Sequence, residues 1–186
     1  MKFAALLASA GILFVSPALA GTVIPLDHFS SVKVSDGGEV IIRHGAVQQV
    51  TLVKGSTEFT DFDVRDGKLD IVTCKQRCPH NYSLEIDIVM PKITAVAAED
   101  GGSIETQGTF PAQEKLAAWA NDGGRVDVRA ITASQADAKA DDGGDILIRA
   151  GSILNASAED GGSVQYWGNP IVNRTVDDGG SVEKGS

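Results

Sequence analysis

The sequence has few of the residue types from which catalytic and metal sites are usually built. Its 186 residues include only three histidines, two cysteines, two tryptophans and two tyrosines. It carries no Gly-x-Ser-x-Gly motif, no phosphate-binding loop and no zinc motif, which argues against the enzyme classes that these motifs define. The histidines, His28, His44 and His80, lie too far apart in sequence to share a local metal motif. We therefore expect a protein that is not an enzyme and needs no cofactor.

Positive charge and long apolar runs are also scarce. The chain has 16 Lys and Arg residues against 25 Asp and Glu residues, a net charge of −9. An acidic surface disfavours binding to nucleic acid and to anionic lipid. After residue 20, no stretch approaches the 18 or more apolar residues of a membrane-spanning helix. These absences predict a protein with no nucleic-acid partner and no membrane span.

The first 20 residues are the one strongly apolar segment. Lys2 precedes an apolar run, and the small residues before Gly21 form a cleavage site between Ala20 and Gly21. This pattern predicts a secretory signal peptide over residues 1–20, because the run is too short for a membrane anchor. Residues 21–186 would then be exported to the periplasm or the cell exterior, and they suffice for a single domain.

The two cysteines, Cys74 and Cys78, are separated by three residues. In an exported chain such a pair is expected to form a local disulfide, which we place at the tip of a hairpin. The alternative is half of a metal site with His80. That site would lack a fourth protein ligand, so the disulfide is favoured.

A repeated tripeptide, Asp-Gly-Gly, dominates the second half of the chain. Its five copies are spaced by 22, 20, 18 and 18 residues, and an earlier copy begins at Asp36. A fixed period near 20 is typical of solenoids, in which each repeat forms one layer. The five aspartates are Asp100, Asp122, Asp142, Asp160 and Asp178.

Apolar residues alternate with polar ones on both sides of each copy, which predicts strands with one buried face. The buried positions before the Asp are mostly Ala, and those after it are mostly Ile or Val. Similar residues recur in register, so we expect parallel stacking. The predicted fold is all-β, a right-handed parallel β-helix, or solenoid, with about 18–22 residues per layer. Segments around Phe110 and Ile131 would be loops that lengthen two layers.

The first half is expected to contain strands of the same kind. Residues 32–34 and 40–42 flank the Asp36 turn and match the later layers. A strand over residues 47–53, a hairpin turning at Asp66-Gly67 and a strand over residues 82–90 follow.

This order of features resembles the head GIN domain family, described for the heads of autotransporter adhesins. The residues that carry the resemblance are Phe29-x-x-Val32-x-Val34, Asp66-Gly67-x-Leu69-x-Ile71, Ile88-x-Met90-Pro91 and the Gly-rich layers that follow. It implies one exported β-solenoid domain over residues 21–186, with a core of about 26–182, and no established enzyme activity.

The aspartate column is one candidate site. At the spacing of stacked strands, about 4.8 Å, two carboxylates repel by about 3.5 kcal/mol at an effective dielectric constant of 20. In one interpretation each Asp only shapes a corner, its carboxylate accepting the N–H two residues on. In the other, Ca²⁺ ions bridge successive layers. The corner interpretation is favoured, and Ca²⁺ remains open.

Three aromatic residues, Trp119, Tyr166 and Trp167, are candidates for stacking on a glycan, although they could equally cover the edge of the core. The favoured function is a non-enzymatic binding or adhesion module of the cell envelope, with an envelope protein or a glycan as partner. The alternatives are a structural protein whose open end pairs with another copy, giving a homo-oligomer, and a carbohydrate-active β-helix enzyme.

Overall fold

The computed structural model describes residues 21–186, and the predicted signal peptide lies outside this part of the chain. The described residues form strands and connecting turns and contain no helix. In particular, they contain no helix of the length and apolarity needed to cross a membrane. The strands are β1 (Thr22–Ile24), β2 (Ser31–Ser35), β3 (Glu39–His44), β4 (Gln49–Lys54), β5 (Asp61–Arg65), β6 (Lys68–Val72), β7 (Glu85–Met90), β8 (Ala95–Ala98), β9 (Ser103–Gln107), β10 (Gln113–Ala120), β11 (Arg125–Ala140), β12 (Asp145–Ala158), β13 (Ser163–Gly168), β14 (Ile171–Val176) and β15 (Ser181–Lys184).

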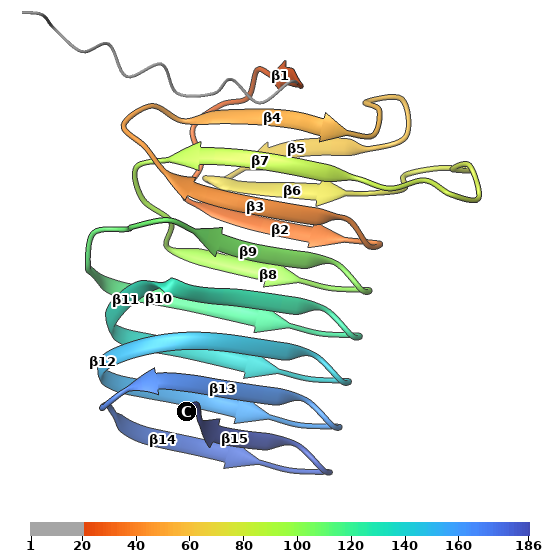
Figure 1. Cartoon of the computed structure of the whole chain (residues 1–186). Helices are drawn as coiled ribbons and strands as arrows, with labels where there is room; N and C mark the ends of the chain where they lie inside the picture. The colour runs from red at the N-terminus through yellow and green to blue at the C-terminus, as the bar shows by residue number, and fades with distance from the viewer. Residues whose placement is uncertain (1–20) are drawn as a thin grey trace, which may run out of the picture.

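The strands fall into two stacks, which we name by their relation to the Asp-Gly-Gly corners. Inbound strands lead into a corner and stack in the order β6, β2, β8, β10, β11, β12 and β14. Outbound strands leave a corner and stack in the order β7, β3, β9, β11, β12, β13 and β15. The long strands β11 and β12 belong to both stacks, so the chain curls from one stack to the other without a break (Figure 1).

The core lies between the two stacks. The alignment on the aspartates predicted which residues would face each other from layer to layer, and the strand register confirms it. On the inbound side Ala98, Ala120, Ala140 and Ala158 are in register and buried. On the outbound side the buried column is larger: Val40, Ile104, Val126, Ile146, Val164 and Val182.

The prediction of a purely parallel β-helix is wrong, because the fifteen strands form one curled, mixed sheet whose main path runs through eleven of them. Three pairings at the N-terminal end are antiparallel: β1 with β4, β4 with β7, and β5 with β6. Strands β4 and β5 lie along the otherwise unpaired edges of β7 and β6. Antiparallel neighbours can be reached through short turns, such as Asp66-Gly67 between β5 and β6, and they cover edges that would otherwise attract another chain.

Two local expectations also need correction. Ile131 is fully buried within β11 rather than lying in a loop. The segment that contains the Cys74–Cys78 disulfide is not a hairpin tip, because it joins β6 to β7, which lie in different stacks. It therefore occupies the place that an Asp-Gly-Gly corner takes in the other layers, and Thr73 anchors it by donating a hydrogen bond of 2.8 Å to the Gly37 carbonyl.

The corners themselves are backbone turns. In the copy at Asp100, both Asp100 and Gly101 have positive φ, 50° and 72°, and the N–H of Gly102 donates to the carbonyl of Glu99 at 2.9 Å. These are the features of a type I′ turn, for which Asp-Gly is a preferred pair. The carboxylate interaction expected from the sequence is thus replaced by a backbone hydrogen bond.

Successive corners are joined to one another by hydrogen bonds. The first Gly of each corner donates its N–H to the Asp carbonyl of the next corner, at 2.9–3.1 Å, from Asp36 through to Asp178. The Asp36 corner therefore stacks directly on the Asp100 corner, although 64 residues separate them in sequence. The corners form one straight edge of the molecule (Figure 1).

Candidate functional site

The outward surface of the inbound strands, which we call the inbound face, carries a hollow of about 590 Å³. It crosses several strands instead of following one. Its base includes the small side chains of Ala95 and Ala97 on β8, and Trp119 on β10 borders it. Charged side chains of both signs, among them Lys33 and Glu99, complete the lining.

Trp119 is the most exposed aromatic feature of this surface. Its side chain points outward because its neighbours Ala118 and Ala120 point into the core, and it is 44% exposed. In the register of the stack, Trp119 lies between Ala97 on β8 and Lys139 on β11. The small Ala97 leaves the indole face open on that side. An aromatic ring in this position offers a flat apolar platform for a ligand.

A second hollow, of about 390 Å³, continues on the other side of Trp119. It contains a ladder of polar side chains on neighbouring strands. The Asn155 amide donates to the Asp137 carboxylate at 2.6 Å, and the Asn173 amide donates to the Asn155 carbonyl oxygen at 2.9 Å. Trp119 and Lys139 line both hollows, so we treat them as one surface and call it the trough.

The charges around the trough are largely paired within the chain. The Nζ of Lys33 lies 2.5 Å from the Oε2 of Glu99, and the Nζ of Lys139 lies 3.3 Å from the Oδ2 of Asp141. The hydrogen bond that Lys139 donates to Asp141 and the negative charge of Glu159 raise the pKa of Lys139. A ligand in the trough therefore meets paired charges, amides, one indole ring and, at the far end, Arg174, which donates to the Val182 carbonyl at 3.3 Å.

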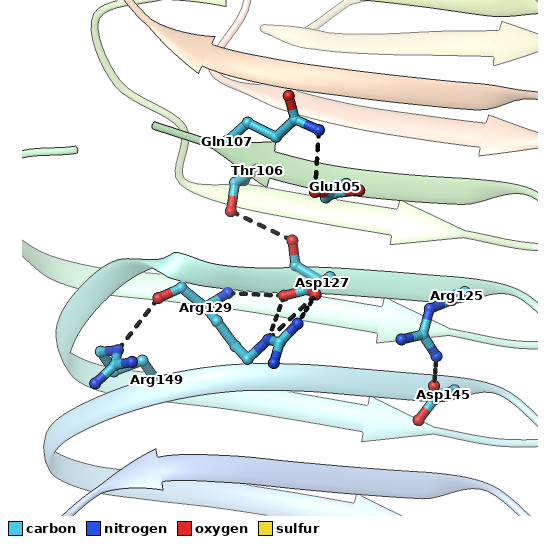
Figure 2. Close-up of polar contacts among 8 residues, drawn as sticks. All are labelled: Glu105, Thr106, Gln107, Arg125, Asp127, Arg129, Asp145 and Arg149. Atoms are coloured by element: carbon cyan, nitrogen blue, oxygen red, sulfur yellow. Dashed lines mark hydrogen bonds and ion pairs between the residues drawn. The ribbon is translucent and has the colours of Figure 1, made fainter. Parts of the chain in front are cut away.

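The outward surface of the outbound strands, the outbound face, carries a different cluster (Figure 2). The Nε of Arg129 donates to both carboxylate oxygens of Asp127, at 2.9 and 3.1 Å, and Arg125 pairs with Asp145. Partial burial would raise the pKa of Asp127, but hydrogen bonds from the side chain and backbone of Arg129, together with the positive charges of Arg129 and Arg125, lower it. Arg149 donates to the Arg129 carbonyl at 3.2 Å. These groups bind one another and tie adjacent layers together.

The three aromatic candidates are not brought together. Tyr166 and Trp167 lie on β13, an outbound strand, whereas Trp119 is on an inbound strand. Tyr166 packs partly against the core. The guanidinium of Arg129 lies 4.8 Å from the centre of the Trp167 ring, and the Trp167 indole N–H donates to the Ser186 carbonyl at 3.3 Å. The chain itself thus covers part of Trp167, whereas Trp119 is open to solvent between the two hollows.

The aspartate column runs along the edge formed by the corners. Carboxylate oxygens of Asp141, Asp142 and Asp160 lie within 4.8 Å of one another. Partial desolvation of Asp160, followed by the negative charges of Asp178 and Asp142, raises its pKa. At Asp160 the neighbouring carboxylates therefore disfavour the charged form.

The sequence did not single out Asp137, Asn155, Asn173 or Lys139. The signal was present, because the first three stand five residues before Asp142, Asp160 and Asp178. That offset puts them in one outward column of the stacked layers, as the register shows.

Comparisons with known proteins agree with this architecture. A family model described as "Putative auto-transporter adhesin, head GIN domain" matches residues 28–116 and 112–170. A search of the curated proteins finds no match. The solved structure of a "putative adhesin" from Bacteroides fragilis is 13% identical, with a TM-score of 0.54 over 91% of this chain and 97% of that chain. Another, from Parabacteroides merdae, is also 13% identical and covers 90% and 96%, with a TM-score of 0.46. At this identity the first similarity concerns the fold alone.

Proposed function

Because this chain belongs to the head GIN domain family, we propose that it is a non-enzymatic binding module of the cell envelope and that the trough on the inbound face is its binding surface. Residues 21–186 act as one domain, exported to the periplasm or the cell exterior after removal of residues 1–20. Their stacked layers are a right-handed solenoid closed at the N-terminal end by antiparallel strands. The joining of all fifteen strands in one sheet supports treating them as a unit.

The observation that carries the proposal is the exposure of Trp119 between two hollows. A large apolar ring on a surface of otherwise short or charged side chains is costly to leave in water. Trp119 is 44% exposed, and its neighbours supply hydrogen-bonding groups on both sides. A ring flanked by a few polar groups is the usual composition of a small-ligand site.

The ligand class that fits this composition is a glycan. A sugar ring has an apolar face that packs on an indole and a rim of hydroxyl groups that bond to amides and carboxylates. The trough offers Trp119 for the first kind of contact and the Asn155–Asn173 ladder for the second. Catalysis would require an acid and a base that converge on one bond, whereas Asp137, Glu99 and Asp141 are already bound to neighbouring side chains.

A glycan array probed with the purified chain, residues 21–186, tests this function. We expect binding to a subset of glycans and a loss of roughly tenfold or more in affinity for Trp119→Ala, since a central aromatic contact commonly dominates binding. Trp167→Ala is the matched control, because it removes the other tryptophan from the opposite stack. If neither the parent chain nor the control binds any glycan, or if Trp119→Ala binds as well as the parent, the proposal is wrong.

A structural role is the second candidate, supported by the C-terminal end. Among the described residues, β14 pairs with β12 alone and β15 with β13 alone. Ile171 on β14 is 72% exposed, and Val176 is 45% exposed. Open strand edges of this kind can pair with those of a second copy and so join two copies. Sedimentation at increasing concentration tests it: association that Ile171→Lys abolishes would support assembly, and a monomer at every concentration would exclude it.

A further inference from the structure

We infer that the trough takes an unbranched, uncharged polysaccharide that runs along the stack, crossing the strands at right angles and passing over Trp119. This inference names the ligand of the proposed binding surface and so rests on the proposed function. It adds the direction, the length and the charge of the bound chain.

The direction follows from the placement of the two hollows. The first is lined from β6 through β2, β8 and β10 to β11, and the second continues from β11 through β12 to β14. From Lys68 on β6 to Thr175 on β14 the trough crosses six strand spacings, about 29 Å at about 4.8 Å each. Only an extended molecule contacts that whole length.

The shape of the trough agrees with a narrow chain. The middle row of side chains in the first hollow consists of Lys33, Ala97 and Trp119, one from each neighbouring strand. The floor of the hollow is low at Ala97, because its side chain is a single methyl group. The row toward the corners rises higher, with Glu99 and Asn121. The row on the other side rises only in the second hollow, with Asp137, Asn155 and Asn173. Branches on the ligand would meet these side rows, so an unbranched chain fits better.

The preference for an uncharged ligand follows from the ion pairs. The side-chain nitrogens of Lys33, Lys68 and Lys139 each lie within 3.3 Å of a carboxylate oxygen. Arg174, at the far end of the trough, donates to the Val182 carbonyl at 3.3 Å. An acidic polymer would have to displace those carboxylates, and a basic polymer would compete with the lysines. Hydroxyl groups need no such exchange. Each asparagine amide has two N–H donors, and the ladder uses one from Asn155 and one from Asn173.

An extended peptide is the main competing ligand, and the structure disfavours it here. A peptide commonly binds by adding a strand to an open sheet edge. The strands under the trough, from β2 to β12, are paired on both sides. Their backbone groups are therefore used within the sheet. Among the strands that line the trough only β14, at its far end, has an open edge, so over the rest of its length the trough offers side chains alone.

Calorimetry with linear oligosaccharides of increasing length tests the inference. The probes are neutral oligomers of glucose, mannose and N-acetylglucosamine, two to six units long, with oligogalacturonate as the acidic counterpart. We expect affinity for at least one neutral series to rise with each added unit, and Trp119→Ala to weaken every length on the order of tenfold. Asn173→Ala, at the far end of the trough, should weaken only the longer oligomers. Asn169→Ala, which lies on the turn between β13 and β14, is the control and should change none.

The outcomes separate this inference from the proposed function. Binding that depends on Trp119 but not on length would overturn the extended chain and leave the binding surface in place. Tighter binding of oligogalacturonate than of every neutral series would overturn the uncharged ligand. If no oligomer and no glycan on the array binds, the proposed function fails and this inference fails with it.

Discussion

The second glycine of each corner is predicted to be required for space, and Gly144 is the clearest case. A Cβ added to Gly144 would lie 2.2 Å from the carbonyl oxygen of Ala120 and 2.5 Å from its carbonyl carbon. That oxygen belongs to the backbone of the adjacent layer and already accepts a hydrogen bond from the Asp141 N–H at 3.0 Å. The layers would have to separate to admit a methyl group. Overpacking costs about 1–3 kcal/mol and a weakened hydrogen bond about 1 kcal/mol, so Gly144→Ala should lose about 2–4 kcal/mol of unfolding free energy.

Two other glycines provide matched comparisons. Gly143, the first glycine of the same corner, has φ of +73° and nothing within 4 Å of an added Cβ. Gly143→Ala should therefore cost only the left-handed conformation, about 1–2 kcal/mol, and Gly143→Asn less, since Asn tolerates that region. Gly151 lies within β12, where the nearest atom to an added Cβ is 3.5 Å away. Gly151→Ala should be neutral or stabilising by about 0.4–1 kcal/mol.

Urea unfolding at 25 °C, followed by circular dichroism, measures these differences directly. A loss of about 3 kcal/mol corresponds to a fall of roughly 6–12 °C in Tm for a domain of this size. The expected order of damage is Gly144→Ala, then Gly143→Ala, then Gly143→Asn, with Gly151→Ala least. If Gly143→Ala destabilises the protein as much as Gly144→Ala, conformation and not interlayer space explains the glycine pair.

Three further predictions concern the corners and the disulfide. The raised pKa of Asp160 means that its carboxyl binds a proton more strongly in the folded state, so its charge lowers stability as pH rises through that pKa. Asp160→Asn should therefore raise Tm at pH 7, and this gain should vanish near about pH 3, where the carboxyl is protonated. The control is Asp66→Asn, which lies at the same left-handed turn position but outside the column. Equal gains in Tm for both variants at every pH would contradict the electrostatic explanation. At constant ionic strength we expect Ca²⁺ to leave Tm unchanged, because backbone hydrogen bonds form the corners. A rise in Tm that a chelator reverses and that Asp160→Asn removes would instead identify a bound ion. Replacing Cys74 and Cys78 together with Ser should cost at most about 2 kcal/mol in urea unfolding, the value for so short a loop, whereas failure to fold would mean that the bridge is essential to the layer it closes.

Much of the layer structure could be predicted because the repeat encodes it. Each Asp-Gly pair marks a turn, and the residues at fixed offsets from it alternate between core and surface. The register of Ala120 with Ala98 and of Val126 with Ile104 follows from that spacing. Alternation carries no information about strand direction, however. The sequence of β4 reads like that of any other strand, yet β4 runs antiparallel to β7. Its direction is set by the need to cover an edge, which is a property of the finished sheet.

The candidate site was only partly visible in the sequence. Trp119 could be chosen because large aromatic residues are rare in this chain. The separation of Trp119 from Trp167 could not be predicted, because it depends on which stack each strand joins. Asn155 and Asn173 become a ladder only when their layers are adjacent. Their fixed offset from the Asp-Gly-Gly copies places them in one outward column, just as the offsets of the apolar residues define the inward columns.

The joining of one corner to the next has a consequence for how such a surface changes over generations. Residues 142–159 form a unit of 18 residues that begins with one Asp-Gly-Gly copy and ends just before the next. Duplicating or deleting such a unit would leave every remaining corner with an equivalent neighbour to bond to. The surface would grow or shrink in steps of about 4.8 Å, so the length of ligand that it spans can be adjusted by copy number, without redesign of any single layer.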